Sequence, residues 1–203
     1  MLKWYLIACI IGYLLGSVPF ALVIGKVFFK KDIRTAGSGN LGGGNAGRVL
    51  GAKAGLAVMT MDILKVTLAM FLSSLLPGGR NVIVAAGFAA AIGHCFPVFA
   101  SFKGGKAVAT LYGFLFGLIV VCGQNILLFI VPLVIFLIVL YLAKIVALAS
   151  IVSSLAAAVY VLISMGVGLP FAAVLVLDAL IVWRHRANLQ RIRNHEENKV
   201  HWL

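Results

Sequence analysis

Long apolar runs dominate this sequence and constrain its fold more than any other feature. Several of them reach about 20 residues, the length that an α-helix needs to cross a bilayer. In total 63% of the residues are hydrophobic and 11% are charged, whereas soluble domains have about 45–50% apolar and about 25% charged residues. A soluble fold of this size could not bury so much apolar surface. We therefore expect an integral membrane protein.

The breaks between these runs predict an all-α fold with seven transmembrane helices in a single domain over residues 1–203. The expected spans are 4–25, 55–76, 80–100, 107–122, 124–143, 145–165 and 168–183. The span 107–122 is short, and a re-entrant segment is its alternative. A cleaved signal peptide is the alternative for the first span, but the apolar run resumes after Pro19 and favours an uncleaved helix.

The basic residues give this arrangement a direction. With a cytoplasmic C-terminus and the N-terminus outside, all 17 lysines and arginines except Lys3, Arg80 and Lys65 lie at the cytoplasmic side, as the positive-inside rule requires. Three polar segments, 30–54, 101–106 and 184–199, then face the cytoplasm. The formal charge of +12 is spread between apolar runs, which favours anionic lipids and substrates as partners and argues against nucleic acid.

The first polar segment contains a glycine-rich stretch, 36–48. Its G-x-G-x-x-G pattern begins at Gly37, but no strand–helix–strand unit surrounds it, which argues against a dinucleotide site. The backbone amides of such a turn suit an anion, and Arg48 can grip phosphate in a bidentate manner. The neutral donors beside them are Ser38, Asn40 and Asn45. A flexible loop that meets lipid headgroups is the alternative.

The other two polar segments also carry cations beside apolar helices. Lys103-Gly104-Gly105-Lys106 leads directly into an apolar run, so free amides at a helix start would bind an anion; lysines that merely snorkel to headgroups are the alternative. In the last segment Arg184, Asn188 and Arg191 share a helix face, and His185 neighbours Asn188. An ordinary basic membrane anchor is the alternative there.

Few residues inside the spans can do chemistry. Asp62 and Lys65 can pair at i, i+3, for a functional or a structural reason, and Asp178 lacks a partner nearby in sequence. The three cysteines are dispersed, and no metal-ligand cluster or nucleophile elbow stands out. We therefore expect no metal and no cofactor. Cations and amides without a strong base suit a substrate that is already activated, or binding and transport of an anion.

These motifs, in this order, resemble the bacterial glycerol-3-phosphate acyltransferases that use acyl phosphate as the donor. The resemblance covers almost the whole chain. It rests on Leu15-Gly16-Ser17-Val18-Pro19-Phe20, Gly37-Ser38-Gly39-Asn40 with Gly42, Asn45 and Arg48, Asp62-Ile63-Leu64-Lys65, His94 with Pro97-Val98-Phe99, Phe102-Lys103-Gly104-Gly105-Lys106-Ala107-Val108-Ala109-Thr110, Leu148-Ala149-Ser150, and Arg184-His185-Arg186-x-Asn188-x-x-Arg191. The chain departs at Gly43-Gly44, where the family usually has Ala-Thr, and at His195, where it has glycine.

The resemblance implies an enzyme of the bacterial plasma (inner) membrane that acylates position 1 of sn-glycerol 3-phosphate at the cytoplasmic side. The products would be lysophosphatidic acid and phosphate, with long-chain acyl phosphate, glycerol 3-phosphate and membrane lipids as partners and no cofactor. The implied catalytic residues are His185, Asn188, Ser150 and Ser38, and the implied substrate-binding residues are Asn40, Asn45, Arg48, Lys103, Gly104, Gly105, Lys106 and Arg184. An anion transporter and a lipid-binding scaffold are the alternatives from other classes.

Overall fold

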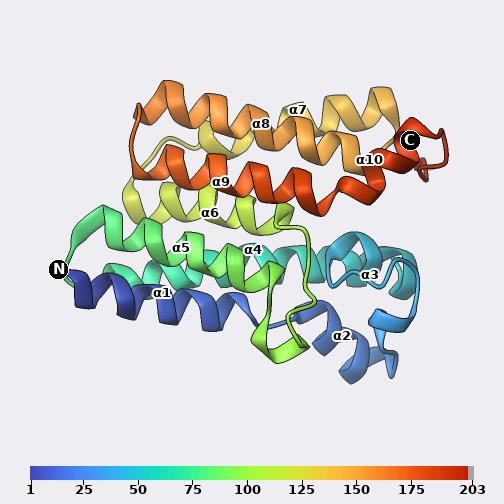
Figure 1. The fold of residues 1–203 in the computed structure, drawn as a ribbon, viewed down its shortest axis with the longest axis horizontal. Helices are drawn as coiled ribbons and strands as arrows, with labels where there is room; N and C mark the ends of the chain where they lie inside the picture. The colour runs from blue at the N-terminus through green and yellow to red at the C-terminus, as the bar shows by residue number, and fades with distance from the viewer. Residues whose placement is uncertain (201–203) are drawn as a thin grey trace. The chain divides into compact units, whose positions relative to one another are not determined.

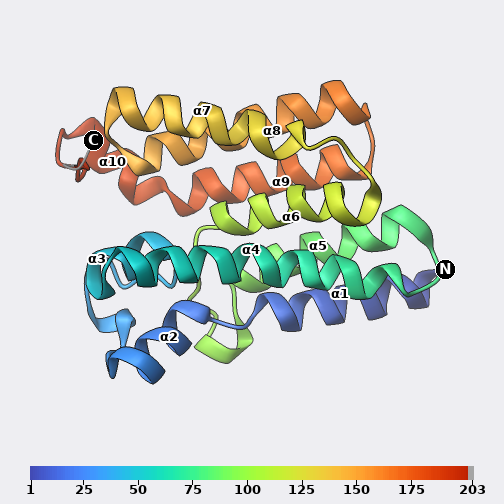
Figure 2. The ribbon, with the colours of Figure 1, turned by 180° about the vertical axis from the view of Figure 1, so that it is seen from behind.

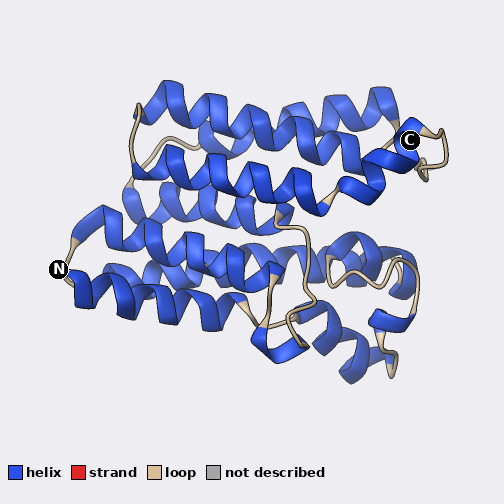
Figure 3. Cartoon of the chain, in the orientation of Figure 1, coloured by secondary structure: helices blue, strands red, loops and turns tan. Residues whose placement is uncertain are grey.

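The computed structural model describes residues 1–200 and is helical throughout that range, without a β-strand (Figure 3). The all-α prediction is therefore confirmed. The chain divides into two compact units, with unit 1 formed by residues up to Gly123 and unit 2 beginning at Gln124. We describe each unit by itself.

Unit 1 is a bundle in which α1 packs along α5, and α4 packs against both α5 and α6 (Figures 1 and 2). Its elements are α1 Leu2–Gly16, α2 Phe20–Phe29, the 3₁₀ turn η1 Ile33–Thr35, α3 Gly43–Leu50, α4 Ala52–Ser74, α5 Gly79–Cys95, the 3₁₀ turn η2 Val98–Ala100, and α6 Val108–Cys122. The α1–α5 contact is close because Gly12 and Gly16 lie against the backbone of Ala86 and Ala90. Small residues at this spacing let helix backbones approach within a membrane.

The first predicted span is broken rather than continuous. α1 ends at Gly16, and α2 begins at Phe20 after Pro19. Proline lacks the N–H that would continue the helix, and it moves the preceding residue, Val18, out of the helical region. Together the two pieces, Leu2–Phe29, are apolar and long enough to cross a membrane. The prediction of one helix over 4–25 was therefore wrong in its continuity.

The glycine-rich stretch contains a helix that the sequence did not predict. It turns as far as Gly42 and then forms the helix α3, which packs on α4. Gly55 on α4 makes the approach possible, because a Cβ there would meet Gly47 and the Gly43 carbonyl. The prediction of a turn over the whole stretch missed this helix, since its glycines serve packing rather than flexibility.

Unit 2 consists of α7 Leu127–Ala143, α8 Val146–Met165, α9 Leu169–Arg184 and α10 Arg186–Arg193 (Figure 1). α8 packs against both α7 and α9, and α10 touches α8 and α9. The helix predicted to leave the membrane over 183–193 is interrupted at His185, so Arg184 closes α9 while Asn188 and Arg191 belong to α10.

Four segments are apolar and long enough to cross a membrane, namely Leu2–Phe29, Ala52–Ser74, Gly79–Ala100 and Val146–Met165. The other three predicted spans are helices at the expected places, but α6, α7 and α9 are shorter, with 15, 17 and 16 residues. The seven-span topology and its orientation therefore remain predictions.

Candidate active site

Asn45 organises the first polar segment from inside. Its side chain is buried on α3, and its Oδ1 accepts from the Ser38 amide at 2.8 Å. Its Nδ2 donates to the carbonyls of Ile33 and Ala36, each at 3.1 Å. Both amide hydrogens are thereby used. The prediction that Asn45 donates to substrate is corrected by this geometry, because Asn45 instead shapes the turn that presents Ser38.

Arg48, on α3, is an exposed cation beside this turn. Its guanidinium donates to Ser38 Oγ at 3.3 Å, and both residues are exposed. Two cations nearby in the chain are engaged by Asp32, which pairs with Arg34 at 2.6 Å and with Lys26 at 3.6 Å. The hydrogen bonds from Arg34 hold the pKa of the Asp32 carboxyl well below its usual range. Arg48 has no carboxylate partner among residues 1–200, which suits it to bind an external anion. Asn40 lies part-buried in the same turn.

Replacing Asn45 with aspartate is expected to lower the melting temperature of the protein in detergent by about 5–10 °C. The buried Ile33 carbonyl and the part-buried Ala36 carbonyl would lose their donor. The loss is taken as about 2.5 kcal/mol in total, near the lower end of the usual range of about 1–3 kcal/mol each, and 1 kcal/mol shifts the melting temperature of a chain this size by about 2–4 °C. Asn125→Asp is the matched control, because only its side-chain oxygen is used, accepting from the Leu127 amide. Equal melting of both variants would contradict the assigned role.

The Lys103–Lys106 segment is folded back on the end of α5. The amides of Gly104 and Gly105 donate to the carbonyls of Cys95 and His94 at 3.2 and 3.0 Å. These two amides are therefore not the free donors that the sequence predicted. Lys103 is exposed and Lys106 half-buried, so the lysine side chains and the first turn of α6, which begins at Val108, are the groups placed for an anion.

The two polar segments of unit 1 share one buried cluster. It contains Ile33 of η1, Leu41 and Ala46 of the glycine-rich stretch, and Ala100 of η2, together with residues of α2 and α4. Arg48 follows Ala46 by half a turn of α3, and Lys103 follows Ala100 closely. The structure therefore brings the first two predicted motifs together through their apolar neighbours.

Replacing Gly105 with alanine is expected to raise the KM for glycerol 3-phosphate, the substrate that the resemblance implies, by about 10- to 100-fold. An effect of this size is usual when binding groups are displaced by about 1 Å. A Cβ at this position would collide with the buried imidazole of His94, so the segment must move. Gly44→Ala is the control, because a Cβ there meets nothing within 4 Å. Steady-state kinetics of the two variants make the comparison, and a wild-type KM for Gly105→Ala would show that the segment tolerates the shift.

In unit 2, His185 lies at the junction between α9 and α10. It is only 4% exposed, and its Nδ1 is 2.8 Å from the Ile181 carbonyl. A carbonyl can only accept, so Nδ1 carries the proton and Nε2 is the acceptor nitrogen of the neutral ring. This tautomer is the one that a general base acting through Nε2 requires.

A carboxylate that sequence reasoning did not place in the site organises α10. Glu197 accepts from Asn188 Nδ2 and from Arg191 Nε, each at 2.7 Å. Asn188 and Arg191 do share a face, as predicted, and Glu197 fixes the amide of Asn188. No local sequence pattern indicates this contact, because the link of Glu197 to Asn188 depends on a tail that folds back after α10.

The remaining predicted residues of unit 2 lie on α8 and α9. Ser150 is buried near the start of α8, and its hydroxyl donates to the Val146 carbonyl at 2.8 Å. Arg184 is half-buried at the end of α9, 5.9 Å from the Trp183 ring centre. Ser150 therefore keeps its hydroxyl on its own helix, and Arg184 lies beside the His185 junction.

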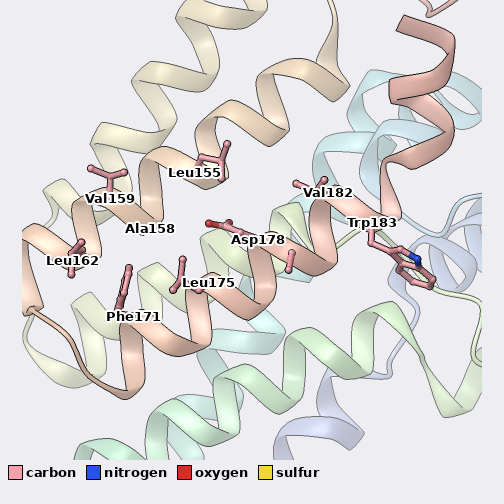
Figure 4. A pocket seen from close by; sticks show the side chains of 10 residues that line it. Leu155, Ala158, Val159, Leu162, Phe171, Leu175, Asp178, Val182 and Trp183 are labelled. Carbon is pink, nitrogen blue, oxygen red and sulfur yellow. The ribbon is translucent and has the colours of Figure 1, made fainter. Parts of the chain in front are cut away.

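An apolar groove runs between α8 and α9 (Figure 4). It has a volume of about 680 Å³ and is lined by Leu155, Ala158, Val159, Leu162, Phe171, Leu175, Asp178, Ala179, Val182 and Trp183. Asp178 is its one carboxylate and is 3% exposed. Ser154 lies close to Asp178, but its hydroxyl donates to the Ile151 carbonyl at 3.0 Å. The groove ends at Trp183, two residues before His185.

Comparison with known proteins places these motifs in one family. The sequence profile described as glycerol-3-phosphate acyltransferase matches residues 6–195. The chain belongs to the glycerol-3-phosphate acyltransferase family. The glycerol-3-phosphate acyltransferase of Listeria monocytogenes is 46% identical over 196 residues, with 96% of each chain covered. That of Geobacillus kaustophilus is 46% identical over 194 residues, covering 95% of this chain and 94% of the relative.

Solved structures agree with this assignment to the glycerol-3-phosphate acyltransferase family. The crystal structure of PlsY, an integral membrane glycerol 3-phosphate acyltransferase, in its glycerol 3-phosphate form has a TM-score of 0.87 at 32% identity and covers 97% of this chain and 95% of that chain. The lysophosphatidic acid form has a TM-score of 0.84, covering 96% and 94%. The resemblance inferred from the motifs is therefore confirmed.

Proposed function

We propose that this chain transfers an acyl group from acyl phosphate to the 1-position of sn-glycerol 3-phosphate, releasing phosphate and lysophosphatidic acid. The observation that carries the proposal is the family match over residues 6–195, which includes all three polar motifs. The structural relative PlsY has been solved in glycerol 3-phosphate and lysophosphatidic acid forms, which are the expected acceptor and product. The donor follows from the chemistry below.

The proposed site binds phosphate and lacks a preformed nucleophile. Arg48, exposed beside Ser38, and the lysines that flank Gly104 and Gly105 supply positive charge. Neither Arg48 nor these lysines can act as the base that would activate a hydroxyl for covalent catalysis. Such a site suits a donor whose leaving group is already good, and phosphate is a good leaving group. This reasoning favours acyl phosphate.

The substrate hydroxyl attacks the acyl carbonyl in the proposed reaction, and its proton goes to a base while phosphate leaves. His185, with Nε2 as its acceptor nitrogen, is the proposed base. Asn188 and Ser38 are proposed to stabilise the oxyanion. Ser150, whose hydroxyl hydrogen goes to the Val146 carbonyl, is proposed to orient a reacting group through its oxygen. No metal or cofactor is required by this scheme. Arg48, Asn40, Lys103, Lys106 and Arg184 are proposed to hold the phosphates.

The groove between α8 and α9 is the proposed place for the acyl chain. Its apolar lining extends along α9 from Phe171 to Trp183, a length of roughly 18 Å of helix. This length exceeds the thickness of one leaflet, about 15 Å, in a hydrocarbon core about 30 Å thick. The groove ends near His185, so a chain lying in it would bring its carbonyl toward that residue. This arrangement supports a long-chain donor.

The proposed topology has seven spans in one membrane domain of the bacterial plasma (inner) membrane, with the N-terminus outside and the active site cytoplasmic. The distribution of basic residues supports it. Labelling of single cysteines from each side of sealed vesicles tests the orientation. A cysteine at position 103 (Lys103→Cys) that can be labelled only from the non-cytoplasmic side of the membrane would contradict the proposed orientation.

Phosphate release by the detergent-purified protein, given palmitoyl phosphate with and without glycerol 3-phosphate, tests the proposed reaction. Release that requires glycerol 3-phosphate and yields lysophosphatidic acid is expected. Consumption of acyl-CoA instead would show that the donor is wrong. Uptake of glycerol 3-phosphate into vesicles without turnover would favour the transporter, and neither activity in a folded protein would favour the scaffold.

A further inference from the structure

A buried cluster of three ionisable side chains lies in unit 1, apart from the residues assigned to substrates above. Asp62 and Lys65 lie one turn apart on α4, and His94 lies at the end of α5. Lys65 Nζ is 2.7 Å from Asp62 Oδ1 and 3.0 Å from His94 Nδ1. Each residue is at most 5% exposed. The predicted pair of Asp62 with Lys65 is thereby confirmed and extended by a third member.

The ammonium group of Lys65 contacts three partners. Besides the ion pair with Asp62 and the contact with His94, it donates a hydrogen bond to the Val18 carbonyl at 3.0 Å. Val18 directly precedes Pro19 at the break between α1 and α2, where a carbonyl loses its helical partner. Lys65 therefore joins three places in unit 1: that break, α4 and the end of α5.

The ammonium also fixes the imidazole of His94. Because an ammonium has no acceptor, Nδ1 accepts from Lys65, and the neutral ring carries its hydrogen on Nε2. The Nε2 edge is turned toward Gly105, since a Cβ on Gly105 would collide with Nε2 and Cε1. The carbonyl of His94 also accepts from the Gly105 amide. His94 thus supports Gly105 with both its ring and its backbone.

We propose that Asp62, Lys65 and His94 form a positioning network that fixes the Lys103–Lys106 segment for phosphate binding. The inference rests on the proposed function, which assigns phosphate to this segment. Asp62 holds the ammonium of Lys65, the ammonium orients the imidazole of His94, and the imidazole edge supports Gly105. The three residues act through the segment, so they are positioning residues and not catalytic ones.

Stability alone does not account for such a network. Removing one partner of a buried ion pair is strongly destabilising, but replacing the whole pair with neutral groups of similar volume is often neutral or stabilising. The double variant Asp62→Asn with Lys65→Met separates the two roles. It is expected to melt near the wild-type temperature and to bind glycerol 3-phosphate about 10-fold more weakly, because His94 loses the group that orients it.

His94→Asn provides a second variant. The amide oxygen of asparagine can replace Nδ1 as acceptor for Lys65, while nothing remains at the position of Nε2 to support Gly105. We expect a dissociation constant for glycerol 3-phosphate raised about 10-fold, with a matching rise in KM and a smaller change in kcat. Thr67→Val is the control: Thr67 also lies on α4, and its hydroxyl donates to the Gly113 carbonyl away from the network.

Calorimetric binding of glycerol 3-phosphate, thermal melting and steady-state kinetics of these proteins form the test. A folded double variant, or His94→Asn, with wild-type affinity overturns the positioning role. If the double variant does not fold, His94→Asn decides alone. A wild-type protein that neither binds nor turns over glycerol 3-phosphate contradicts the proposed function instead, so the two failures are distinguishable.

Discussion

Replacing His185 with alanine is expected to lower kcat by about 10²- to 10⁴-fold, the usual contribution of a positioned general base. The KM for glycerol 3-phosphate should change little, because the ring is buried at the junction of α9 and α10 and its Nδ1 is bonded to the Ile181 carbonyl. Phosphate release from palmitoyl phosphate, measured over a range of glycerol 3-phosphate concentrations, gives both constants.

His185→Asn separates the base from its support. The asparagine amide can still donate to the Ile181 carbonyl, as Nδ1 does, but it offers no nitrogen at the position of Nε2. We expect this variant to lose kcat as severely as His185→Ala while melting closer to the wild type. A His185→Asn enzyme with near-normal kcat would show that His185 only holds the junction between the helices, and a substrate phosphate would then be the better base.

Replacing Arg48 with alanine is expected to raise the KM for glycerol 3-phosphate by about 10²- to 10⁴-fold. Two hydrogen bonds to a charged group contribute about 1.5–3 kcal/mol each, and each 1.4 kcal/mol is a factor of ten. The fold should tolerate the change, because Arg48 is exposed and its only hydrogen bond within residues 1–200 is to Ser38 Oγ. Initial rates at saturating palmitoyl phosphate give the KM.

Arg48→Lys is the matched variant, since it keeps the charge but not the planar pair of donors. An intermediate KM is expected for it. Arg34→Ala is a further control, because Arg34 is already paired with Asp32 and should contribute little to substrate affinity. Unchanged turnover of glycerol 3-phosphate in Arg48→Ala would remove Arg48 from the phosphate site.

The lengths of the apolar runs predicted most of the long helices, but they did not predict the interruptions at Pro19 and His185. Runs of apolar residues locate α4 and α8 because burial in lipid demands them. The break at Pro19 is stabilised by Lys65, which lies far away in sequence. The helix α3 has a glycine-rich sequence of low helix propensity, so it depends on tertiary packing against Gly55 that no local pattern reveals.

The sequence predicted which residues form the candidate site, but not which of them face solvent and which hold the backbone in place. Arg48 and Asn45 both belong to the glycine-rich motif, yet Arg48 faces solvent while the side-chain amide of Asn45 makes three hydrogen bonds to the backbone of the turn. The Ile33 carbonyl and the Glu197 carboxylate become hydrogen-bond partners of Asn45 and Asn188 only because the backbone turns back toward them. The residue types alone do not predict these turns. At His195 the family glycine has a reason, because φ there is +59° and lies in the left-handed region.

The shortness of α6 has a consequence for the depth at which substrates meet. Its 15 residues rise only ~23 Å, several ångströms less than a hydrocarbon core of about 30 Å. If α6 spans the membrane as proposed, the bilayer must thin around it or its ends must sit below the headgroups. The lysines before α6 would then draw a lipid-borne phosphate slightly inward. A donor with its tail still in the leaflet could reach the site without leaving the membrane.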